Sequence, residues 1–370
     1  MTIRTLLPVA LALALAACAA HAPPPAPATP PAVTTEIPAA LLPPVPQPPE
    51  RALPPASVTD PTLPREARVA AFVDYASQLY GVDPNAIRAQ LAQAQVLQRT
   101  LDIISRPAEA VRPWRDYRPI FMTDARIQAG VAFYRDNRAQ LDRIAADTGV
   151  PPEYIVAIIG VETFYGRNTG SYRVLDVLNT LAFDYPKRAP FFAGELAQLF
   201  ALGNDEHLDV STLTGSYAGA MGLGQFMPSS WRAWGRDGDG DGRRDLLGDK
   251  ADVFASIANY FVAHGWERGA PVVARASLDP SKAEFLPGTV DPVYPPADLA
   301  TRGYHVQAGE PVPGATQSPG ATVLGLDGDA GREYWFGYRN FYVITRYNHS
   351  PMYALAVHQL AQAIRAGAGP

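Results

Sequence analysis

One acidic side chain, Glu162, stands in an otherwise apolar helical pattern. The segment from Pro151 to Gly166 opens with prolines, has an acid in its first turn and ends at a glycine, all of which favour a helix. Glu162 follows Ile158 by four residues and Ile159 by three, so helical geometry puts it on their apolar face, toward the interior or the floor of a cleft. Desolvation there raises the pKa of a carboxyl group, as a general acid near neutral pH requires.

Helical geometry leaves a second interpretation of Glu162 open. A carboxylate on an apolar face also suits a buried structural ion pair, for which Arg167 and Arg173 are the candidate partners. Ordinary glycosidases use two carboxylates. The next acids along the chain, Asp176 and Asp184, occur in no setting that marks either as a catalytic partner.

A glycine-rich stretch over residues 215–231 offers backbone that a ligand can approach closely. It lacks the Gly-Lys-Ser/Thr of a phosphate-binding loop and the Gly-x-Ser-x-Gly of a hydrolase nucleophile. Ser216 and Gln225 supply neutral hydrogen-bonding groups, and Tyr217 and Phe226 supply aromatic faces, a combination that suits a polyhydroxylated sugar. The alternative is a glycine-rich turn between helices.

An acidic repeat after Arg236 has the spacing of the first part of an EF-hand calcium loop. Acids occupy positions one, three, five and nine, a glycine occupies position six, and a carbonyl falls at position seven. The matching residues are Asp237, Asp239, Asp241, Asp245, Gly242 and Arg243. Position twelve is Gly248, so Asp249 or Asp252 would have to close a longer loop. A charged surface turn without an ion is the alternative, and the scattered histidines do not indicate zinc.

The first eighteen residues have the pattern of an export signal. Arg4 precedes an apolar run over residues 6–17, which is too short to span a bilayer, and Cys18 follows directly. Cys18 is the single cysteine of the chain, and the pattern predicts that it is lipidated and tethers the protein to a membrane. A thiol within a signal peptide cleaved elsewhere is the alternative. By resemblance to Gram-negative lipoproteins, Ala19 favours the outer membrane, with the protein facing the periplasm.

The remaining sequence divides by composition. Residues 19–64 form a Pro/Ala-rich linker, and residues 65–148 are predicted to form a helical domain. A catalytic core is predicted over residues 149–264 and 334–366, interrupted by a β-rich insertion over 265–333. Helices are expected over about 65–80, 84–94, 124–148, 151–165, 196–202, 231–234, 251–264 and 351–364. The net charge of −5, without a basic run, argues against nucleic acid as a partner.

Four blocks of sequence together resemble the membrane-bound lytic murein transglycosylase B family. They occur in the family's order at residues 159–170, 216–231, 258–261 and 340–350. The resemblance implies a mainly α (α+β) fold with a lysozyme-like core, and it makes Glu162 the catalytic acid. It also implies that the sugar chain contacts Tyr117, Ser216, Gln225, Tyr260, Tyr347, Asn348 and Tyr353. For each tyrosine, core packing with a satisfied hydroxyl is the alternative.

The resemblance further implies a reaction. Glu162 would protonate the β-1,4 bond between N-acetylmuramic acid and N-acetylglucosamine in peptidoglycan, then accept the proton of the muramyl 6-hydroxyl, leaving a 1,6-anhydromuramyl end. Ser216 and Asn348 would help to orient the substrate. No cofactor is needed for this chemistry, and any Ca²⁺ would be structural, with Asp252 favoured over Asp249 to close its loop.

Two other functions remain open at this point. One is a hydrolytic muramidase that uses water in place of the 6-hydroxyl group. The other is a non-catalytic, calcium-stabilised lipoprotein that binds peptidoglycan. The expected partners are glycan strands and the membrane, with cell-wall synthesis proteins as a further class that the sequence does not identify.

Overall fold

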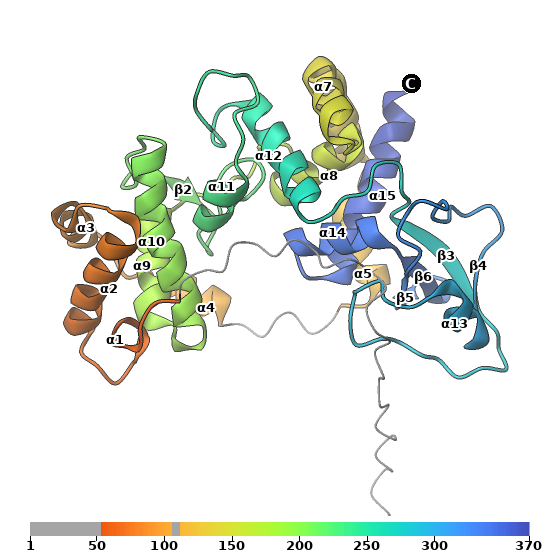
Figure 1. The fold of residues 1–370 in the computed structure, drawn as a ribbon, viewed down its shortest axis with the longest axis horizontal. Coiled ribbons are helices and arrows are strands. Elements are labelled where there is room, and N and C mark those ends of the chain that lie inside the picture. Colours follow the sequence, from red (N-terminus) through yellow and green to blue (C-terminus); the bar gives the residue numbers. More distant parts are fainter. Residues whose placement is uncertain (1–52, 106–111, 370) are drawn as a thin grey trace, which may run out of the picture. The chain divides into compact units, whose positions relative to one another are not determined.

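The computed structural model describes residues 53–105 and 112–369, and it is mostly helical with two small antiparallel sheets (Figure 1). The predicted signal peptide, Cys18 and most of the predicted linker lie outside the described residues. The mainly α fold class that the sequence predicts is confirmed.

The first helices pack beside a later pair. Their bounds are α1 (Ala56–Thr59), α2 (Arg65–Tyr80), α3 (Pro84–Leu91) and α4 (Gln98–Ile104). Asp83 caps α3 by accepting a hydrogen bond from the amide of Asn85, and Pro84 opens the helix, as the sequence predicts. The prediction of a linker without helix as far as residue 64 is wrong for its last part. There α1 forms because the Val58 side chain is fully buried in the core.

The next helices complete the predicted helical domain over residues 65–148 and include the Glu162 segment. They are α5 (Trp114–Phe121), α6 (Asp124–Asp136), α7 (Arg138–Thr148) and α8 (Pro152–Thr163). The single helix expected over 124–148 is interrupted at Asn137, whose side chain donates to the carbonyl of Phe133. Helix α2 contacts α9 (Val174–Asp184) and α10 (Ala189–Asp205). Helices α6 and α7 instead contact α8, α12 (Lys250–Ala263) and α15 (Pro351–Ala368). Residues from one predicted domain thus support two different groups of helices.

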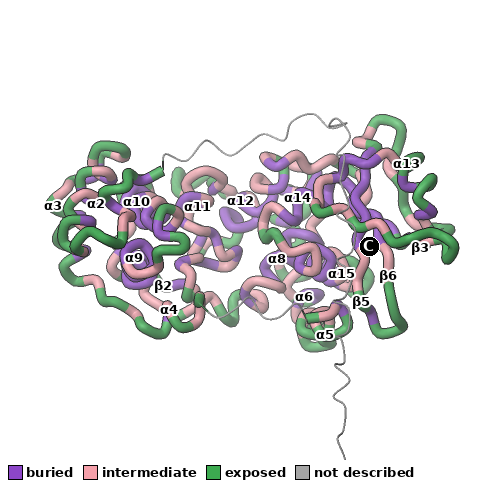
Figure 2. The backbone as a smooth tube through the Cα atoms, turned by 90° about the horizontal axis from the view of Figure 1, so that it is seen from below, coloured by how far each residue is buried: buried purple, intermediate pink, exposed green. Residues whose placement is uncertain are grey.

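Most residues of α8, α9 (Val174–Asp184) and α10 (Ala189–Asp205) are buried, and Figure 2 colours the described chain by this burial. The remaining helices are α9 (Val174–Asp184), the short 3₁₀ helix η1 (Pro186–Arg188), α10 (Ala189–Asp205), α11 (Pro228–Trp234), α12 (Lys250–Ala263), α13 (Pro296–Thr301), α14 (Arg339–Tyr347) and α15 (Pro351–Ala368). Helix α9 was not predicted, because it is apolar almost all round and lacks the one-sided periodicity of a surface helix.

The strands form two antiparallel sheets. Strand β1 (Tyr172–Arg173) pairs with β2 (Thr214–Gly215). This pairing brings the chain that follows the Glu162 segment next to the start of the glycine-rich stretch. The second sheet has the order β4-β3-β6-β5, with β3 (Val273–Leu278), β4 (Tyr304–Val306), β5 (Thr322–Gly328) and β6 (Gly331–Gly337). Strand β6 extends beyond the predicted insertion boundary at residue 333, because its residues up to Gly337 pair with both β3 and β5.

The helices share one large hydrophobic core, and the four-stranded sheet adds a smaller one. Leu324 and Trp335 of the sheet belong to the large core, so this sheet packs on the helices. No single described helix is long and apolar enough to cross a membrane. Helices α7 and α8 reach that length and composition only as a pair bent by 116°.

A close backbone approach at Gly170 generates a stability prediction. Gly170 and Gly166 both have left-handed backbone, with φ of +93° and +86°. A Cβ atom at Gly170 would lie 2.1 Å from the carbonyl of Gly215, whereas at Gly166 the nearest atom is Cγ of Leu223 at 3.7 Å. We expect Gly166→Ala to lower the free energy of unfolding by about 1 kcal/mol and Gly170→Ala by about 3 kcal/mol.

Urea denaturation of the two variants beside the wild type measures this difference. Both substitutions share the backbone strain, so the excess at Gly170 reports the contact with the backbone of Gly215 and Ser216. Equal losses in the two variants would show that the contact does not constrain the strand pair.

Candidate active site

Glu162 lies in the last turn of α8, next to the residue at which the helix ends. Ile158 and Ile159 on the same face are fully buried, while Glu162 keeps partial exposure. The chain turns directly afterwards, because Phe164 and Tyr165 both adopt left-handed backbone with φ of 51° and 59°. A carboxyl group at the end of an apolar helix face is thus both desolvated and accessible, as a proton donor must be.

Among the described residues, one side-chain hydrogen bond holds the carboxyl group. The Tyr353 hydroxyl, on α15, donates to Oε1 of Glu162 at 2.5 Å. Burial raises the pKa of Glu162 from 4.5 to about 7, and the Tyr353 hydrogen bond opposes the rise only in part. Glu162 therefore retains a proton near neutral pH, as the sequence predicts.

The alternative of a structural ion pair is wrong. Arg173 pairs with Asp176, with Nε at 2.8 Å from Oδ2, and the Arg167 guanidinium lies 4.8 Å from the ring centroid of Phe164. Within residues 53–105 and 112–369, no Lys, Arg or His nitrogen lies within 4.0 Å of the Glu162 carboxylate. The carboxyl group remains without a neutralising cation, which keeps its pKa high.

Tyrosines from three helices surround the carboxyl group. Tyr117 of α5, Tyr347 of α14 and Tyr353 of α15 each have a pKa raised by burial and, secondly, by the charge of Glu162. That electrostatic effect shows that the three predicted tyrosines converge on Glu162. Their hydroxyls stay neutral, so they supply hydrogen bonds and ring faces and do not compete for the proton.

The glycine-rich stretch is attached to the end of α8 and to α14. The Thr163 hydroxyl donates to the carbonyl of Leu223 at 3.0 Å, and the Tyr347 hydroxyl donates to the carbonyl of Gly224 at 2.6 Å. The stretch folds back on itself through a bridge between Met221 and Phe226. Backbone that was far away in sequence thereby lies next to Glu162.

Ser216 and Gln225 are both partly exposed within this stretch, and both also hold it together. Oγ of Ser216 accepts from the amide of Ala220 at 3.1 Å. Gln225 has left-handed backbone with φ of 52°, and its Nε2 donates to the carbonyls of Thr169 and Gly222 at 3.1 and 3.0 Å. Ser216 keeps its hydroxyl hydrogen and Gln225 keeps its amide oxygen for a ligand, and a sugar-binding role for both stays a prediction.

The two other predicted sugar contacts differ in exposure. Tyr260 of α12 donates its hydroxyl to the carbonyl of Arg346 at 2.6 Å, and its ring stacks on His264 at 4.0 Å between centroids. Those contacts agree with the packing alternative for the hydroxyl of Tyr260. Asn348 is exposed between α14 and α15, where its Oδ1 accepts from the amide of Ser350 at 3.1 Å.

Phe164 and Arg126 are neighbours of this site that no sequence pattern indicated. The Arg126 guanidinium, on α6, lies 4.9 Å from the ring centroid of Phe164 and 5.2 Å from that of Phe121. Helix α6, which begins 38 residues before Glu162 in the sequence, thus contacts the turn that follows Glu162. Only the tertiary fold brings these residues together.

The acidic repeat forms a compact group of carboxylates. Asp237, Asp239 and Asp252 each place one oxygen within 4.8 Å of the others. Asp252 is buried, and its two oxygens accept from the amides of Gly238 and Asp245, each at 2.6 Å. Burial, followed by the nearby charges, raises the pKa of Asp252. Converging carboxylates of this kind fit a hard divalent cation.

The other predicted ligands are placed differently. Oδ1 of Asp241 accepts from the amide of Arg243 at 2.8 Å, and neither residue belongs to the carboxylate group. Asp249 caps α12 by accepting from the amides of Ala251 and Asp252. Of the two candidates for closing the loop, the structure thus places Asp252 with Asp237 and Asp239.

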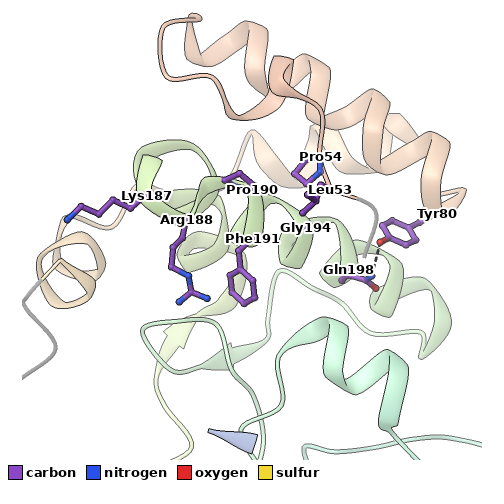
Figure 3. Close-up of a pocket in the computed structure, with 9 residues that line it drawn as sticks. All are labelled: Leu53, Pro54, Tyr80, Lys187, Arg188, Pro190, Phe191, Gly194 and Gln198. Atoms are coloured by element: carbon purple, nitrogen blue, oxygen red, sulfur yellow. Dashed lines mark hydrogen bonds between the residues drawn. The ribbon is translucent and has the colours of Figure 1, made fainter. Parts of the chain in front are cut away.

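A separate pocket of about 320 Å³ lies between the start of the described chain and helix α10 (Figure 3). Leu53, Pro190 and Phe191 line it, and Gln198 donates to the hydroxyl of Tyr80 at its edge at 2.7 Å. No predicted site residue lines this pocket, so it is distinct from the Glu162 site.

Comparison with known proteins identifies the class. Residues 65–362 match the transglycosylase SLT domain. The chain is 42% identical over 302 residues to membrane-bound lytic murein transglycosylase B of Escherichia coli (strain K12), covering 79% of this chain and 81% of the relative. These matches and the lysozyme-like helical fold define the class as an enzyme that acts on peptidoglycan.

Solved structures agree with this class. Soluble lytic transglycosylase SltB1 from Pseudomonas aeruginosa has 48% identity and a TM-score of 0.75, covering 80% of this chain and 98% of its own. Escherichia coli Slt35, solved in complex with calcium, has 40% identity and a TM-score of 0.73, with coverage of 81% and 93%. SltB3 from Pseudomonas aeruginosa, solved with NAG-anhNAM-pentapeptide, has 29% identity and a TM-score of 0.70, with coverage of 82% and 80%.

The chain belongs to the transglycosylase SLT domain family. It is a lytic transglycosylase that acts on peptidoglycan. The resemblance seen in the sequence blocks is confirmed.

The raised pKa of Glu162 predicts a pH-dependent stability. Unfolding returns the pKa from about 7 to its ordinary value of 4.5, so the stability that the protonated group provides is complete below pH 4.5 and is lost as the pH rises to 7. Relative to Glu162→Gln, the wild type should lose roughly 2–3 kcal/mol of unfolding free energy over this range and no more above it. Urea denaturation at several pH values measures this difference.

Tyr353→Phe provides the control for the cause of the shift. The variant lacks the Tyr353 hydroxyl, which stabilises the ionised Glu162 carboxylate, so the pKa of Glu162 should rise further. The stability difference should therefore continue to change at a higher pH than in the wild type. A difference between wild type and Glu162→Gln that does not vary with pH would contradict the raised pKa.

Proposed function

We propose that this enzyme cleaves the β-1,4 bond between N-acetylmuramic acid and N-acetylglucosamine with Glu162 as its single catalytic carboxylate. The observation that carries the proposal is the isolation of Glu162. Burial and the Tyr353 hydroxyl alone set its pKa, and no second carboxylate among the described residues perturbs it. A two-carboxylate glycosidase requires a second acid close by.

The proposed reaction uses the same carboxyl group twice. Glu162 donates its proton to the glycosidic oxygen as the bond from that oxygen to C1 of the muramyl residue breaks. The muramyl 6-oxygen then bonds to C1 and releases its proton to the Glu162 carboxylate, which restores the starting state. Atoms balance without water, and the product carries a 1,6-anhydro ring.

Several contacts support this sequence of steps. The Tyr353 hydroxyl stabilises the carboxylate that forms after the first proton transfer, and it stays neutral because burial raises its own pKa. The substrate's N-acetyl group would stabilise the positive charge at C1, with Ser216 and Asn348 as orienting groups. The ligand named for SltB3, NAG-anhNAM-pentapeptide, contains an anhydro sugar.

We further propose that the protein is anchored to the outer membrane through lipidated Cys18 and faces the periplasm. The support is the sequence pattern around Cys18 and the likeness to a relative described as membrane-bound. Labelling with a palmitate analogue, compared with Cys18→Ser, tests the anchor.

We also propose that Asp237, Asp239 and Asp252 hold a structural Ca²⁺, with Asp241 and the Arg243 carbonyl as further ligands. The three grouped carboxylates support it, and so does the calcium complex of Slt35. The ion would tie the loop to the start of α12, where Asp252 is buried. It would take no part in the chemistry.

Digestion of purified sacculi tests the reaction. Wild-type enzyme should release muropeptides that are one water lighter than hydrolytic products, measured by mass spectrometry. Glu162→Gln should lower the rate by about 10²–10⁴-fold because it cannot donate the proton. The matched control is Glu153→Gln on the same helix, a buried acid whose carboxylate lies 3.5 Å from Nη1 of Arg365.

Each outcome of the digestion is decisive. Hydrated products would establish a muramidase and reject the anhydro product. Full activity in Glu162→Gln would remove Glu162 from the chemistry. Equal losses in Glu153→Gln and Glu162→Gln would indicate that the changes act through the fold of α8.

Calcium titration tests the metal site. Ca²⁺ should raise the melting temperature of the wild type, because a ligand that binds only the folded state stabilises it. Asp239→Ala should abolish the rise, whereas Asp209→Ala, in another exposed loop, should retain it. A rise that persists in Asp239→Ala would place the ion elsewhere.

A further inference from the structure

A pocket of about 510 Å³ lies beside the active site, between the four-stranded sheet and the turn that joins α14 to α15. Strand β5 and the segment 286–290 form its apolar walls. Arg346, His349 and Pro351 line the side formed by the turn. None of the lining residues is acidic, so the pocket offers positive charge without a built-in counterion.

Arg346 is held in place but not neutralised. Its guanidinium lies 4.2 Å from the ring centroid of Tyr342, and Nη2 donates to Oγ1 of Thr345 at 3.0 Å. Nε is buried without a hydrogen-bond partner. Across the part of the chain that the structure describes, no carboxylate oxygen lies within 4.0 Å of this side chain. A guanidinium that is fixed in place and has no carboxylate partner is suited to an anion.

His349 does not add a second charge. Burial and the neighbouring Arg346 lower the pKa of its imidazole, so the ring is neutral near pH 7. A neutral imidazole donates from one nitrogen and accepts at the other. The pocket thus combines one cation, one neutral polar ring and apolar walls, which matches a peptide with a carboxylate better than a bare sugar.

The pocket shares its elements with the Glu162 site. Arg346 and Tyr347 are the last two residues of α14, and Asn348 and His349 are the next two in the turn that follows. Strand β5 contacts α5, the helix that carries Tyr117. The pocket and the residues around Glu162 are therefore built on the same elements.

Peptidoglycan carries such a group. N-acetylmuramic acid bears a short peptide with free carboxylates on its lactyl arm, next to the bond that the proposed reaction breaks. SltB3 has been solved with NAG-NAM-pentapeptide, so a relative of 29% identity binds a sugar with this peptide. The chemistry of the pocket and that of the substrate are complementary in charge and polarity.

We propose that the pocket lined by Arg346 and His349 binds a carboxylate of the peptide on the muramyl residue. Arg346 is the specificity-determining residue, and it makes the enzyme favour peptide-bearing glycan over peptide-free glycan. The inference rests on the proposed function for the substrate class, but it concerns binding and not the chemical step.

Calorimetry on full-length Glu162→Gln protein separates binding from chemistry. The probes are the disaccharide GlcNAc-MurNAc with a pentapeptide and the same disaccharide without it. Adding Arg346→Met should raise the Kd for the pentapeptide probe about tenfold, because one charge-assisted contact is lost. The Kd for the peptide-free probe should not change.

Two further variants control for folding and for net charge. Arg302→Met removes a guanidinium of the same sheet region, 4.0 Å from the Phe285 ring and outside the pocket, and should leave both Kd values unchanged. Gly288→Leu adds bulk at a residue that lines the pocket without altering charge, and a Cβ there meets nothing within 4 Å. It should weaken only the pentapeptide probe, and it tests the pocket even if Arg346→Met is unstable.

The outcomes distinguish this inference from the proposed function. Equal weakening of both probes by Arg346→Met, or no weakening of either, overturns the peptide pocket. Unchanged binding of the pentapeptide probe in Gly288→Leu overturns it as well. Hydrated products from sacculi would reject the proposed reaction but leave this binding result intact.

Discussion

The desolvated carboxyl group of Glu162 is the constraint that the rest of the site serves. An apolar helix face raises its pKa, and the Tyr353 hydroxyl limits the rise to about 7. Too little burial would leave the group ionised near neutral pH, without the proton that the proposed reaction requires. A nearby cation would have the same effect, and Arg173 is kept away by its pairing with Asp176.

The helices that surround Glu162 come from distant parts of the chain, so the site depends on long-range packing. Helix α15 supplies Tyr353, α5 supplies Tyr117, and the glycine-rich stretch is bonded to Thr163 and Tyr347. Asp252 orders the acidic loop through the amides of Gly238 and Asp245, and it lies in α12, a helix that contacts α8. Disturbing any of these elements would alter the environment of one proton.

The end of α14, the turn after it and the start of α15 carry two sets of residues with different chemistry. Tyr347 and Tyr353 are close enough to Glu162 for its charge to raise their pKa values, whereas Arg346 and His349 line the pocket beside β5. Residues that are adjacent in sequence thus line two different sites. In the proposed function, one site holds the sugar and the other holds the peptide attached to it, so the sheet that packs on the helical core would take part in substrate choice.

The sequence by itself determined the helix around Glu162, its apolar face, the acidic loop and the family, because helical spacing and motif order are local properties. The sequence placed Gln225 and Ser216 in one glycine-rich stretch, but it could not show that both side chains hydrogen-bond to the backbone of that stretch. It missed α9 and the short α1, whose burial is decided by partners far along the chain. Only the tertiary structure decided which groups surround the Glu162 proton, because its solvation, the Tyr353 hydrogen bond and the lack of an ion pair arise from contacts across long sequence separations.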